Sequence, residues 1–264
     1  MTPLAFLRRV PGSFTDCVTR RPARPPLDPA RARRQQDGYR ARLEEGGFAT
    51  VMLPADEAHP DCAFVEDTAV VVGQSALLTR PGHPSRRGEV GPVGEALAGR
   101  GIAVTAVEDP ASLDGGDVLR VGGRLFVGES ERTNDAGRAA LQRFAAGQGL
   151  EVVGVPIRGV LHLKSCVTAL DEETVLAFPD AFRAAAFRTV RLVPVGGDDP
   201  EAANVVRLPD GRILVASHLP QSAAAAAAAG FRAVGCEVSE FARADGGLTC
   251  LSIRLRGPLV HGAT

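Results

Sequence analysis

The stretch DTAVVVGQSALLTR, residues 67–80, consists of two short apolar runs joined by a polar turn. Apolar runs of this length on either side of a turn are typical of a β-hairpin. The pattern returns at 117–130 as DVLRVGGRLFVGES, where Gly122 and Gly123 supply the turn. Two further copies are CVTALDEETVLAFP at 166–179 and NVVRLPDGRILVAS at 204–217. The chain is therefore predicted to repeat one hairpin-containing unit.

A fifth copy, TCLSIRLRG at 249–257, has a first strand but almost no chain left for a second. The five copies begin at intervals of 38 to 50 residues, which indicates five related units. The N-terminal segment LAFLRRV, residues 4–10, is a predicted strand that has no hairpin partner of its own. Pairing these two terminal strands would close the five units into a ring. In such a ring, the loops at the starts of the units meet at one shared site.

Helices are predicted between the hairpins. Residues 28–44 begin with Asp28, a good N-cap, followed by a proline in the first turn. Residues 134–148 begin with Asn134, another favourable cap. The alanine-rich stretch 221–230 has high helix propensity and stops at a glycine. Strands and helices alternate, so the fold class is α/β.

The composition excludes several classes of protein. The chain has 264 residues, of which 45% are hydrophobic, and a formal net charge of −1. This balance gives no electrostatic reason to expect nucleic acid or an acidic membrane as a partner. No run approaches the ~18 apolar residues that span a bilayer. The first residues place their charges after a very short apolar stretch, which is the wrong order for a secretory signal.

The cysteines are odd in number and scattered, with no Cys-x-x-Cys pair: Cys17, Cys62, Cys166, Cys236 and Cys250. This pattern argues against a disulfide framework and against a zinc knuckle, and it favours a reducing cytoplasm. The histidines show no metal-ligand spacing: His59, His83, His162, His218 and His261. We therefore expect no metal and no other cofactor.

Chemically active residues stand at the starts of the units, in the order Asp61, Glu66, Asp67, Asp114, Asp117, His162 and Cys250. Each alone has an ordinary structural interpretation, such as a strand cap, a turn or a buried small side chain. Their coincidence at equivalent positions of a repeat favours a shared site. Carboxylates, one imidazole and one thiol would then converge on the axis of the ring.

The sequence resembles the dimethylarginine dimethylaminohydrolases, members of the guanidine-modifying superfamily with the five-bladed α/β propeller, or pentein, fold. The motifs that carry this resemblance are PDCAFVEDTAVV, TRPGHPSRRGEV, LDGGDVL, FVGESERTN, LHLKS and DGGLTC. The resemblance runs in unbroken order from about residue 4 to residue 255. The resemblance implies a propeller of ββαβ-type units, one catalytic domain over residues 1–264, and hydrolysis of Nω-methylated arginines to citrulline and a methylated amine.

The resemblance also implies a catalytic set. Cys250 is the expected nucleophile, because the resonance-stabilised guanidinium is a poor electrophile and thiolate is the strongest nucleophile that side chains offer. His162 is the expected general acid, which then activates water for the second step. Asp114 would orient the imidazole. Either the substrate cation or His162 would activate the thiol, and the sequence leaves this choice open.

The implied substrate-binding residues are mostly charged. Glu66 and Asp67 are expected at the guanidinium, which carboxylates bind in bidentate geometry, and Asp61 at the α-amino group. Arg86 and Arg132 are expected to clamp the α-carboxylate.

The resemblance also places main chain in the pocket. Main chain near Ala244 is expected to line it. Val18 would belong to a flexible lid over the substrate, although the segment TDCVTRRPARPPLDPA, residues 15–30, departs from the family pattern by its many prolines and arginines. Proline stiffens the chain, so lid motion and KM are expected to differ from those of relatives.

Three alternative functions are compatible with parts of the pattern. An arginine deiminase uses a similar set but carries a large helical insertion, for which this chain has no room. A non-catalytic arginine-binding protein would keep the binding residues yet could lose Cys250 or His162. A phosphate-binding α/β protein would need a G-x-x-x-x-G-K-[ST] motif, which the sequence lacks. The preference for methylated over plain arginine, and the choice between monomer and homodimer, stay open.

Overall fold

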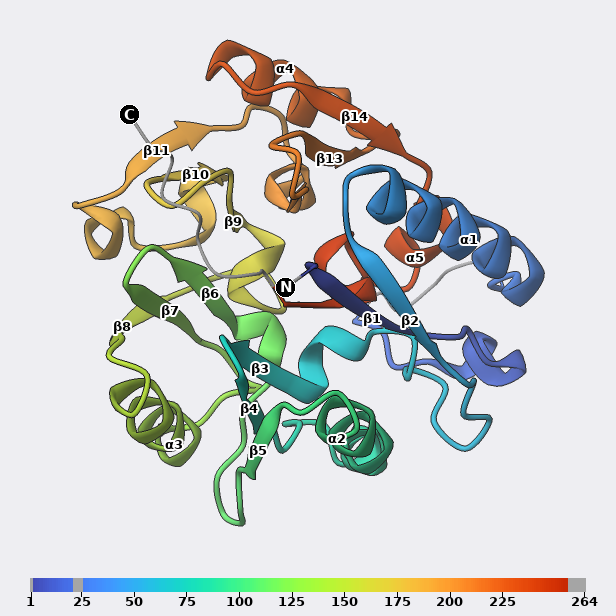
Figure 1. The fold of residues 1–264 in the computed structure, drawn as a ribbon. Helices are drawn as coiled ribbons and strands as arrows, with labels where there is room; N and C mark the ends of the chain where they lie inside the picture. The colour runs from blue at the N-terminus through green and yellow to red at the C-terminus, as the bar shows by residue number, and fades with distance from the viewer. Residues whose placement is uncertain (1, 21–25, 256–264) are drawn as a thin grey trace.

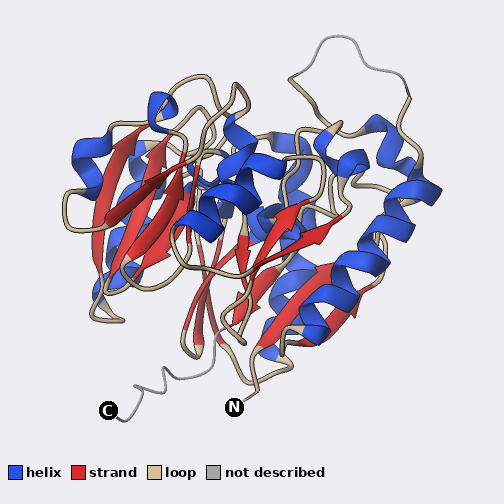
Figure 2. Cartoon of the chain, turned by 90° about the horizontal axis from the view of Figure 1, so that it is seen from above, coloured by secondary structure: helices blue, strands red, loops and turns tan. Residues whose placement is uncertain are grey.

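The computed structural model describes residues 2–20 and 26–255, and its strands form five separate three-stranded sheets. Figure 1 shows these sheets arranged around a common centre, each as one blade of a ring. Seen from above, helices flank the strands of the blades (Figure 2). The predicted five-bladed α/β propeller is confirmed.

Four blades follow one plan, in which a hairpin is extended by a third strand that runs parallel to the hairpin's second strand. These blades are β3 (Ala69–Val72), β4 (Ser75–Leu78) and β5 (Ala103–Ala106); β6 (Val118–Val121), β7 (Arg124–Glu129) and β8 (Glu151–Pro156); β9 (Val167–Ala169), β10 (Thr174–Ala177) and β11 (Arg191–Pro194); and β12 (Val206–Arg207), β13 (Ile213–Ala216) and β14 (Ala233–Cys236).

The fifth blade joins the two ends of the chain. Strand β1 (Leu4–Arg8) pairs antiparallel with β15 (Ile253–Leu255), with Phe6 opposite Ile253, and parallel with β2 (Ala49–Leu53). The blade therefore has the same plan as the others, but its hairpin is assembled from both termini. The predicted ring closure is confirmed, and residues 256–257 of the expected fifth copy lie outside the described residues.

The helices lie mainly at the periphery of the ring (Figure 1): α1 (Pro29–Glu45), α2 (Val90–Ala98), α3 (Asp135–Ala146), α4 (Pro220–Ala228) and the short α5 (Ser239–Ala242). The Asp28 side chain accepts hydrogen bonds from the first turn of α1, and Asn134 caps α3 in the same way. Helices α2 and α5 were not predicted. Among residues 2–20 and 26–255, none of the helices has both the length and the apolar character that a bilayer crossing requires.

The third unit departs from the helical plan. Two short 3-10 turns, Pro179–Ala181 and Ala184–Phe187, take the place of an α-helix between β10 and β11. A 3-10 turn needs fewer residues than an α-helix. This replacement accounts for the shortest interval in the sequence, the one between the copies at 166 and 204.

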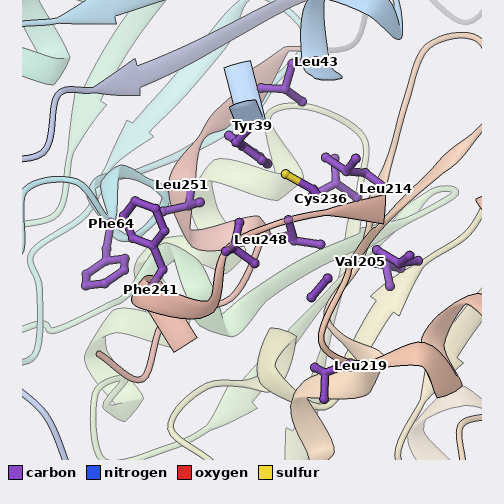
Figure 3. Packing of buried hydrophobic residues seen from close by; sticks show 14 of the residues in the cluster. Tyr39, Leu43, Phe64, Val205, Leu214, Leu219, Cys236, Phe241, Leu248 and Leu251 are labelled. Carbon is purple, nitrogen blue, oxygen red and sulfur yellow. The ribbon is translucent and has the colours of Figure 1, made fainter. Parts of the chain in front are cut away.

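A large core cluster packs against the segment that carries the predicted nucleophile. Phe14, Phe64 and Phe241 form an aromatic triangle with ring centroids 5.6 to 6.2 Å apart. Figure 3 shows Leu248 and Leu251 in the same cluster, and both are almost fully buried. Burial of each leucine contributes roughly 1.5–3 kcal/mol, so both ends of the Cys250 turn are fixed by packing.

Candidate active site

Each unit begins with one turn of 3-10 helix directly before its first strand: η2 (Val65–Thr68), η4 (Gly115–Asp117), η5 (Leu163–Ser165), η8 (Pro200–Ala203) and η9 (Thr249–Leu251). Neighbouring turns pack against one another, η9 on η2, η2 on η4, η4 on η5 and η5 on η8. This arrangement brings together residues that are far apart in sequence. Asp67 lies in η2, Asp114 and His162 are the N-cap residues of η4 and η5, and Cys250 lies in η9.

His162 lies between two carboxylates. Its Nε2 is 2.9 Å from Asp114 Oδ2, and its Nδ1 is 3.9 Å from Asp67 Oδ1. All three residues are at least 96% buried. Asp114 also accepts a hydrogen bond from Gly82 N at 2.7 Å, and Asp67 accepts one from Gly116 N at 2.8 Å, so main-chain amides hold both carboxylates in place.

The Gly-Gly pair of LDGGD is required by close packing. A Cβ atom at Gly116 would lie 2.6 Å from Asp67 Oδ1 and 2.7 Å from His162 Nδ1. A Cβ atom at Gly115 would lie 2.0 Å from the carbonyl oxygen of Glu66. A side chain at Gly116 would push the carboxylate and the imidazole apart, and one at Gly115 would displace the main chain next to Asp67, so these glycines set the spacing of the site.

Asp117 holds the turn that carries His162. Its fully buried carboxylate accepts hydrogen bonds from the Ser130 and Thr133 hydroxyls and from Leu163 N, at 3.1 Å. Burial raises the pKa of Asp117, and the positive charge of His162 opposes that rise. Asp117 therefore supports the site from behind the imidazole.

The Cys250 turn is positioned by Asn204. The Asn204 side chain accepts from Thr249 N at 3.0 Å and donates to Thr249 Oγ1 at 3.0 Å and to the Lys164 carbonyl at 2.8 Å. On the other side of the turn, a Cβ atom at Gly246 would lie 2.2 Å from the Phe64 ring. The DGGLTC motif is thus fixed by close glycine packing and by one buried amide.

Arg86 forms a buried ion-pair cluster with Asp67 and Glu89. Its Nη1 bonds to Asp67 Oδ2 at 2.5 Å, and its Nε and Nη2 bond to the two Glu89 oxygens at 3.0 and 2.8 Å. Nη2 also donates to the Phe64 carbonyl at 2.9 Å. All three guanidinium nitrogens are engaged, so Arg86 holds Asp67 in its orientation while it also lines the cleft.

A small cleft opens beside this constellation, lined by Val18, Asp61, Phe64, Asp67, Arg86, Arg132, Leu161, His162, Ala244, Asp245, Gly246 and Cys250. Cys250 is half-buried there. Asp61 accepts from Val18 N at 3.1 Å on both oxygens, and burial raises its pKa against the opposing charge of Arg86. Arg132 is partly exposed and has no ion-pair partner among residues 2–20 and 26–255. Its guanidinium is therefore available to a ligand.

Glu66, one of the predicted substrate-binding residues, does not line this cleft. Its Oε1 pairs with Lys164 Nζ at 2.6 Å and with Arg254 Nη2 at 3.0 Å, and these three side chains line a separate cavity of about 500 Å³. Its buried Oε2 has no hydrogen-bond partner in the described part of the chain. Glu66 is still close enough to act on the thiol through its charge.

The charges of the site set its protonation state. Burial alone would lower the pKa of His162, but the charge of Asp67 and the hydrogen bond to Asp114 outweigh it and raise the pKa to about 9. Although burial raises the pKa of Asp67, the positive charges of His162 and Arg86 hold it below its usual range. Burial, together with the charges of Glu66 and Asp67, raises the pKa of Cys250 to about 12. The resting site therefore pairs an imidazolium with a neutral thiol.

Asp67, Asp114 and His162 could each offer one atom to a metal ion, and these atoms lie within 4.8 Å of one another. Their oxygens already accept hydrogen bonds from main-chain amides, from Arg86 and from the imidazole. This donor set suits an acid–base group, and the expectation that no metal is required stays a prediction.

Two positioning residues, Glu89 and Asn204, were not predicted from the sequence. Asn204 stands at the start of the fourth unit, so its place in the repeat was the available signal. Glu89 follows Arg86 by three residues, a spacing that suits an ion pair within one helical turn. In the sequence PSRRGEV, that pair looks the same as an exposed one.

The chain closely matches known enzymes over nearly its whole length. It is 40% identical over 259 residues to the N(G),N(G)-dimethylarginine dimethylaminohydrolase of Streptomyces coelicolor, with 96% of each chain covered. It is 30% identical over 231 residues to the protein of the same name from Pseudomonas aeruginosa, with 86% of this chain and 89% of that one covered.

A solved structure gives the same result. A serine-for-cysteine variant of the Pseudomonas aeruginosa enzyme in complex with citrulline superposes with a TM-score of 0.88 at 28% identity, covering 97% of this chain and 100% of that one. No protein-family model matches the chain. The length and identity of the matches, together with the shared propeller, place this chain in the dimethylarginine dimethylaminohydrolase family.

Proposed function

We propose that the protein hydrolyses Nω-methylated arginines to citrulline and methylamine or dimethylamine. The observation that carries this proposal is the convergence of Cys250 with the Asp67–His162–Asp114 group at one cleft. A half-buried thiol beside an imidazolium and a buried carboxylate suits covalent attack on a cationic carbon. Membership in the family supplies the substrate class.

Substrate binding follows from the charges that line the cleft. Asp67 receives the guanidinium, because its carboxylate is buried and oriented by Arg86 and Gly116. Asp61 receives the α-ammonium beside the main chain of Val18. Arg132 holds the α-carboxylate, the positive charge of Arg86 in the cleft wall assists it, and Ala244 forms another part of the wall.

The substrate activates the thiol. Glu66 and Asp67 keep Cys250 neutral in the resting enzyme through their negative charges. A guanidinium bound at Asp67 offsets that negative potential, so the thiol loses its proton to solvent when the cation enters. The resulting thiolate Sγ attacks the guanidinium carbon and forms a C–S bond. Glu66 acts here through its charge, from behind the cleft.

His162 donates a proton in the first step and accepts one in the second. As an imidazolium, it protonates the methylated nitrogen, the C–N bond breaks, and the neutral amine leaves a thiouronium on Cys250. The neutral imidazole then takes one proton from the attacking water, while the second returns to the thiolate as the C–S bond breaks. Asp114 keeps the ring oriented throughout. The cycle ends with citrulline, a neutral thiol and an imidazolium.

The proposal also covers the cellular compartment and the domain organisation of the enzyme. None of the five cysteines is paired with another in a disulfide in the described part of the chain, which supports a reducing compartment such as the cytoplasm. The five units supply one site, which supports a single catalytic domain over residues 1–264.

Mass spectrometry after acid quenching tests the covalent step. During turnover of asymmetric dimethylarginine, the protein should gain the mass of the substrate minus that of dimethylamine, and the label should map to Cys250. Turnover without any label on Cys250 would exclude the proposed intermediate.

A further inference from the structure

The segment that follows β1 and the first 3-10 turn is tied to the cleft by two carboxylates that also line it. Val18 N donates to both oxygens of Asp61. The next two residues bond to Asp245: the Thr19 hydroxyl donates to Oδ2, and Arg20 N donates to the same oxygen at 2.6 Å. Residues 18–20 therefore lie along the cleft between Asp61 and Asp245.

Asp245 adopts an unfavourable backbone conformation. Its φ of 59° makes it the one non-glycine residue with a positive φ among residues 2–20 and 26–255. The left-handed conformation costs a non-glycine residue about 1 kcal/mol or more, although aspartate and asparagine tolerate it better than most. Glycine would take this backbone without strain. The chain therefore keeps a carboxylate where its backbone alone favours glycine, which indicates a role for the side chain.

The other described end of the same connection docks on the same stretch of chain. Asp28 N donates to Glu240 Oε1 at 2.7 Å, and the Pro26 carbonyl accepts from Arg243 Nη2 at 2.9 Å. Glu240 is fully buried and also pairs with Arg243 at 2.8 Å. Residues 240–245 thus hold both sides of the connection, and they lead directly into the loop that carries the nucleophile.

The two carboxylates, of Asp61 and Asp245, have different roles. Asp61 is the proposed acceptor of the substrate α-ammonium, so its oxygens serve both the Val18 amide and the ligand. Asp245 has no part in the proposed chemistry, yet it binds the two residues next to Val18. Fixing Thr19 and Arg20 therefore restricts Val18 before substrate arrives.

We propose that Asp245 is a positioning residue of the reaction, which anchors residues 18–20 beside the cleft so that Val18 and Asp61 are preorganised for the amino-acid end of the substrate. The catalytic consequence rests on the proposed function, whereas the anchoring does not. Preorganisation lowers the cost of ordering on binding, so loss of the anchor should raise KM and leave the chemical step at Cys250 almost unchanged.

Because the backbone at Asp245 is left-handed, the aspartate can be replaced there by glycine or asparagine without straining the fold. Asp245→Gly removes the carboxylate and also relieves the strain, so the fold should be as stable as before or more stable. Asp245→Asn tolerates the same backbone and keeps an oxygen that can accept both hydrogen bonds. Thr19→Val removes one donor from the other partner. Thr15→Val is the matched control, because Thr15 is exposed and its hydroxyl bonds to Asp16, outside this anchor.

Limited trypsin digestion of the full-length protein without substrate measures how firmly residues 18–20 are held. Within residues 19–26, the bond after Arg20 is the one open to trypsin, because prolines follow Arg21 and Arg24. Release of the fragment 1–20 should be about tenfold faster in Asp245→Gly than in the wild type, the change expected when one to two hydrogen bonds are lost. Asp245→Asn and Thr15→Val should stay near the wild-type rate, and Thr19→Val should be intermediate.

Steady-state kinetics with asymmetric dimethylarginine gives the second readout. KM should rise about tenfold in Asp245→Gly with kcat within about twofold, and Asp245→Asn should restore most of it. Equal cleavage and equal KM in Asp245→Gly and wild type would overturn the proposal. A wild-type protein without turnover would instead contradict the proposed function, and the trypsin comparison would still decide whether Asp245 anchors the segment.

Discussion

The imidazole of His162 and the carboxylate of Asp67 lie 3.9 Å apart, Nδ1 to Oδ1, in a site that excludes water from both. Each group therefore stabilises the charge of the other, so the pKa of His162 is raised to about 9 and that of Asp67 is held below its usual range. A guanidinium bound at Asp67 offsets much of the negative charge that stabilises the imidazolium of His162. Substrate binding thus weakens the hold of His162 on its proton just when the leaving nitrogen needs one.

The stability of the protein should depend on this pair. The pKa of His162 is raised from 6.5 in the unfolded chain to about 9 in the native state, so its contribution is complete below pH 6.5 and is lost as the pH rises to 9. The loss is on the order of 3 kcal/mol in the free energy of unfolding. Urea unfolding at several pH values should show this decline in the wild type and a flatter profile in His162→Gln. The same change at His83, which bonds to Ser85, should preserve the decline.

Cys250→Ser should abolish citrulline production while the protein stays folded. Serine is nearly isosteric with cysteine, but its hydroxyl is far less acidic and a much weaker nucleophile, so a loss of at least about 10³-fold in kcat is expected. Thermal unfolding and a citrulline assay measure the two effects separately. Cys236→Ala, at the end of β14, should retain turnover. Substantial residual activity in Cys250→Ser would remove Cys250 from the nucleophile's role.

Asp67→Asn should cost two to three orders of magnitude in kcat/KM. A buried cation that loses its charge partner is destabilised by roughly 3–5 kcal/mol, and both the substrate and Arg86 depend on this carboxylate. Asp56→Asn is the control, since Asp56 pairs with Arg8 and His59 and does not line the cleft. If kcat/KM were the same in Asp67→Asn and wild type, the guanidinium would have to bind elsewhere.

Glu89→Gln tests whether Asp67 is positioned through Arg86. The neutral amide breaks the bidentate pair with Arg86, whose guanidinium can then turn away from Asp67. We expect kcat/KM to fall at least about tenfold and the melting temperature to drop, because a buried charge loses its partner. Glu95→Gln, on an exposed position of α2, should change neither. A variant with lower stability but full kcat/KM would make Glu89 purely structural.

The repeat made most of the fold predictable. Hairpins, helix caps and the pairing of β1 with β15 all follow from local patterns plus the requirement that no strand be left unpaired. The 3-10 turns between β10 and β11 were not predicted, because an alanine-rich stretch near Phe187 does not by itself distinguish a 3-10 turn from an α-helix.

The site was predictable only as far as the repeat aligns its residues. His162, Asp114 and Asp67 stand at unit starts, and the ring brings them together. The direction in which Glu66 points could not be read from the sequence, because it depends on Lys164 and Arg254, which two other units supply. Glu89 was missed for the same reason, since its partner is defined by tertiary packing, whereas Asn204 stands at a unit start and was missed although the repeat aligns it.

A paired assay distinguishes hydrolysis of methylated arginine from hydrolysis of arginine itself. The purified protein is given asymmetric dimethylarginine in one reaction and unmodified arginine in another, and citrulline is quantified in both, with dimethylamine measured in the first. We expect citrulline and dimethylamine in equal amounts from the methylated substrate and little citrulline from arginine. Citrulline mainly from arginine, or none from either substrate, would contradict the proposed function.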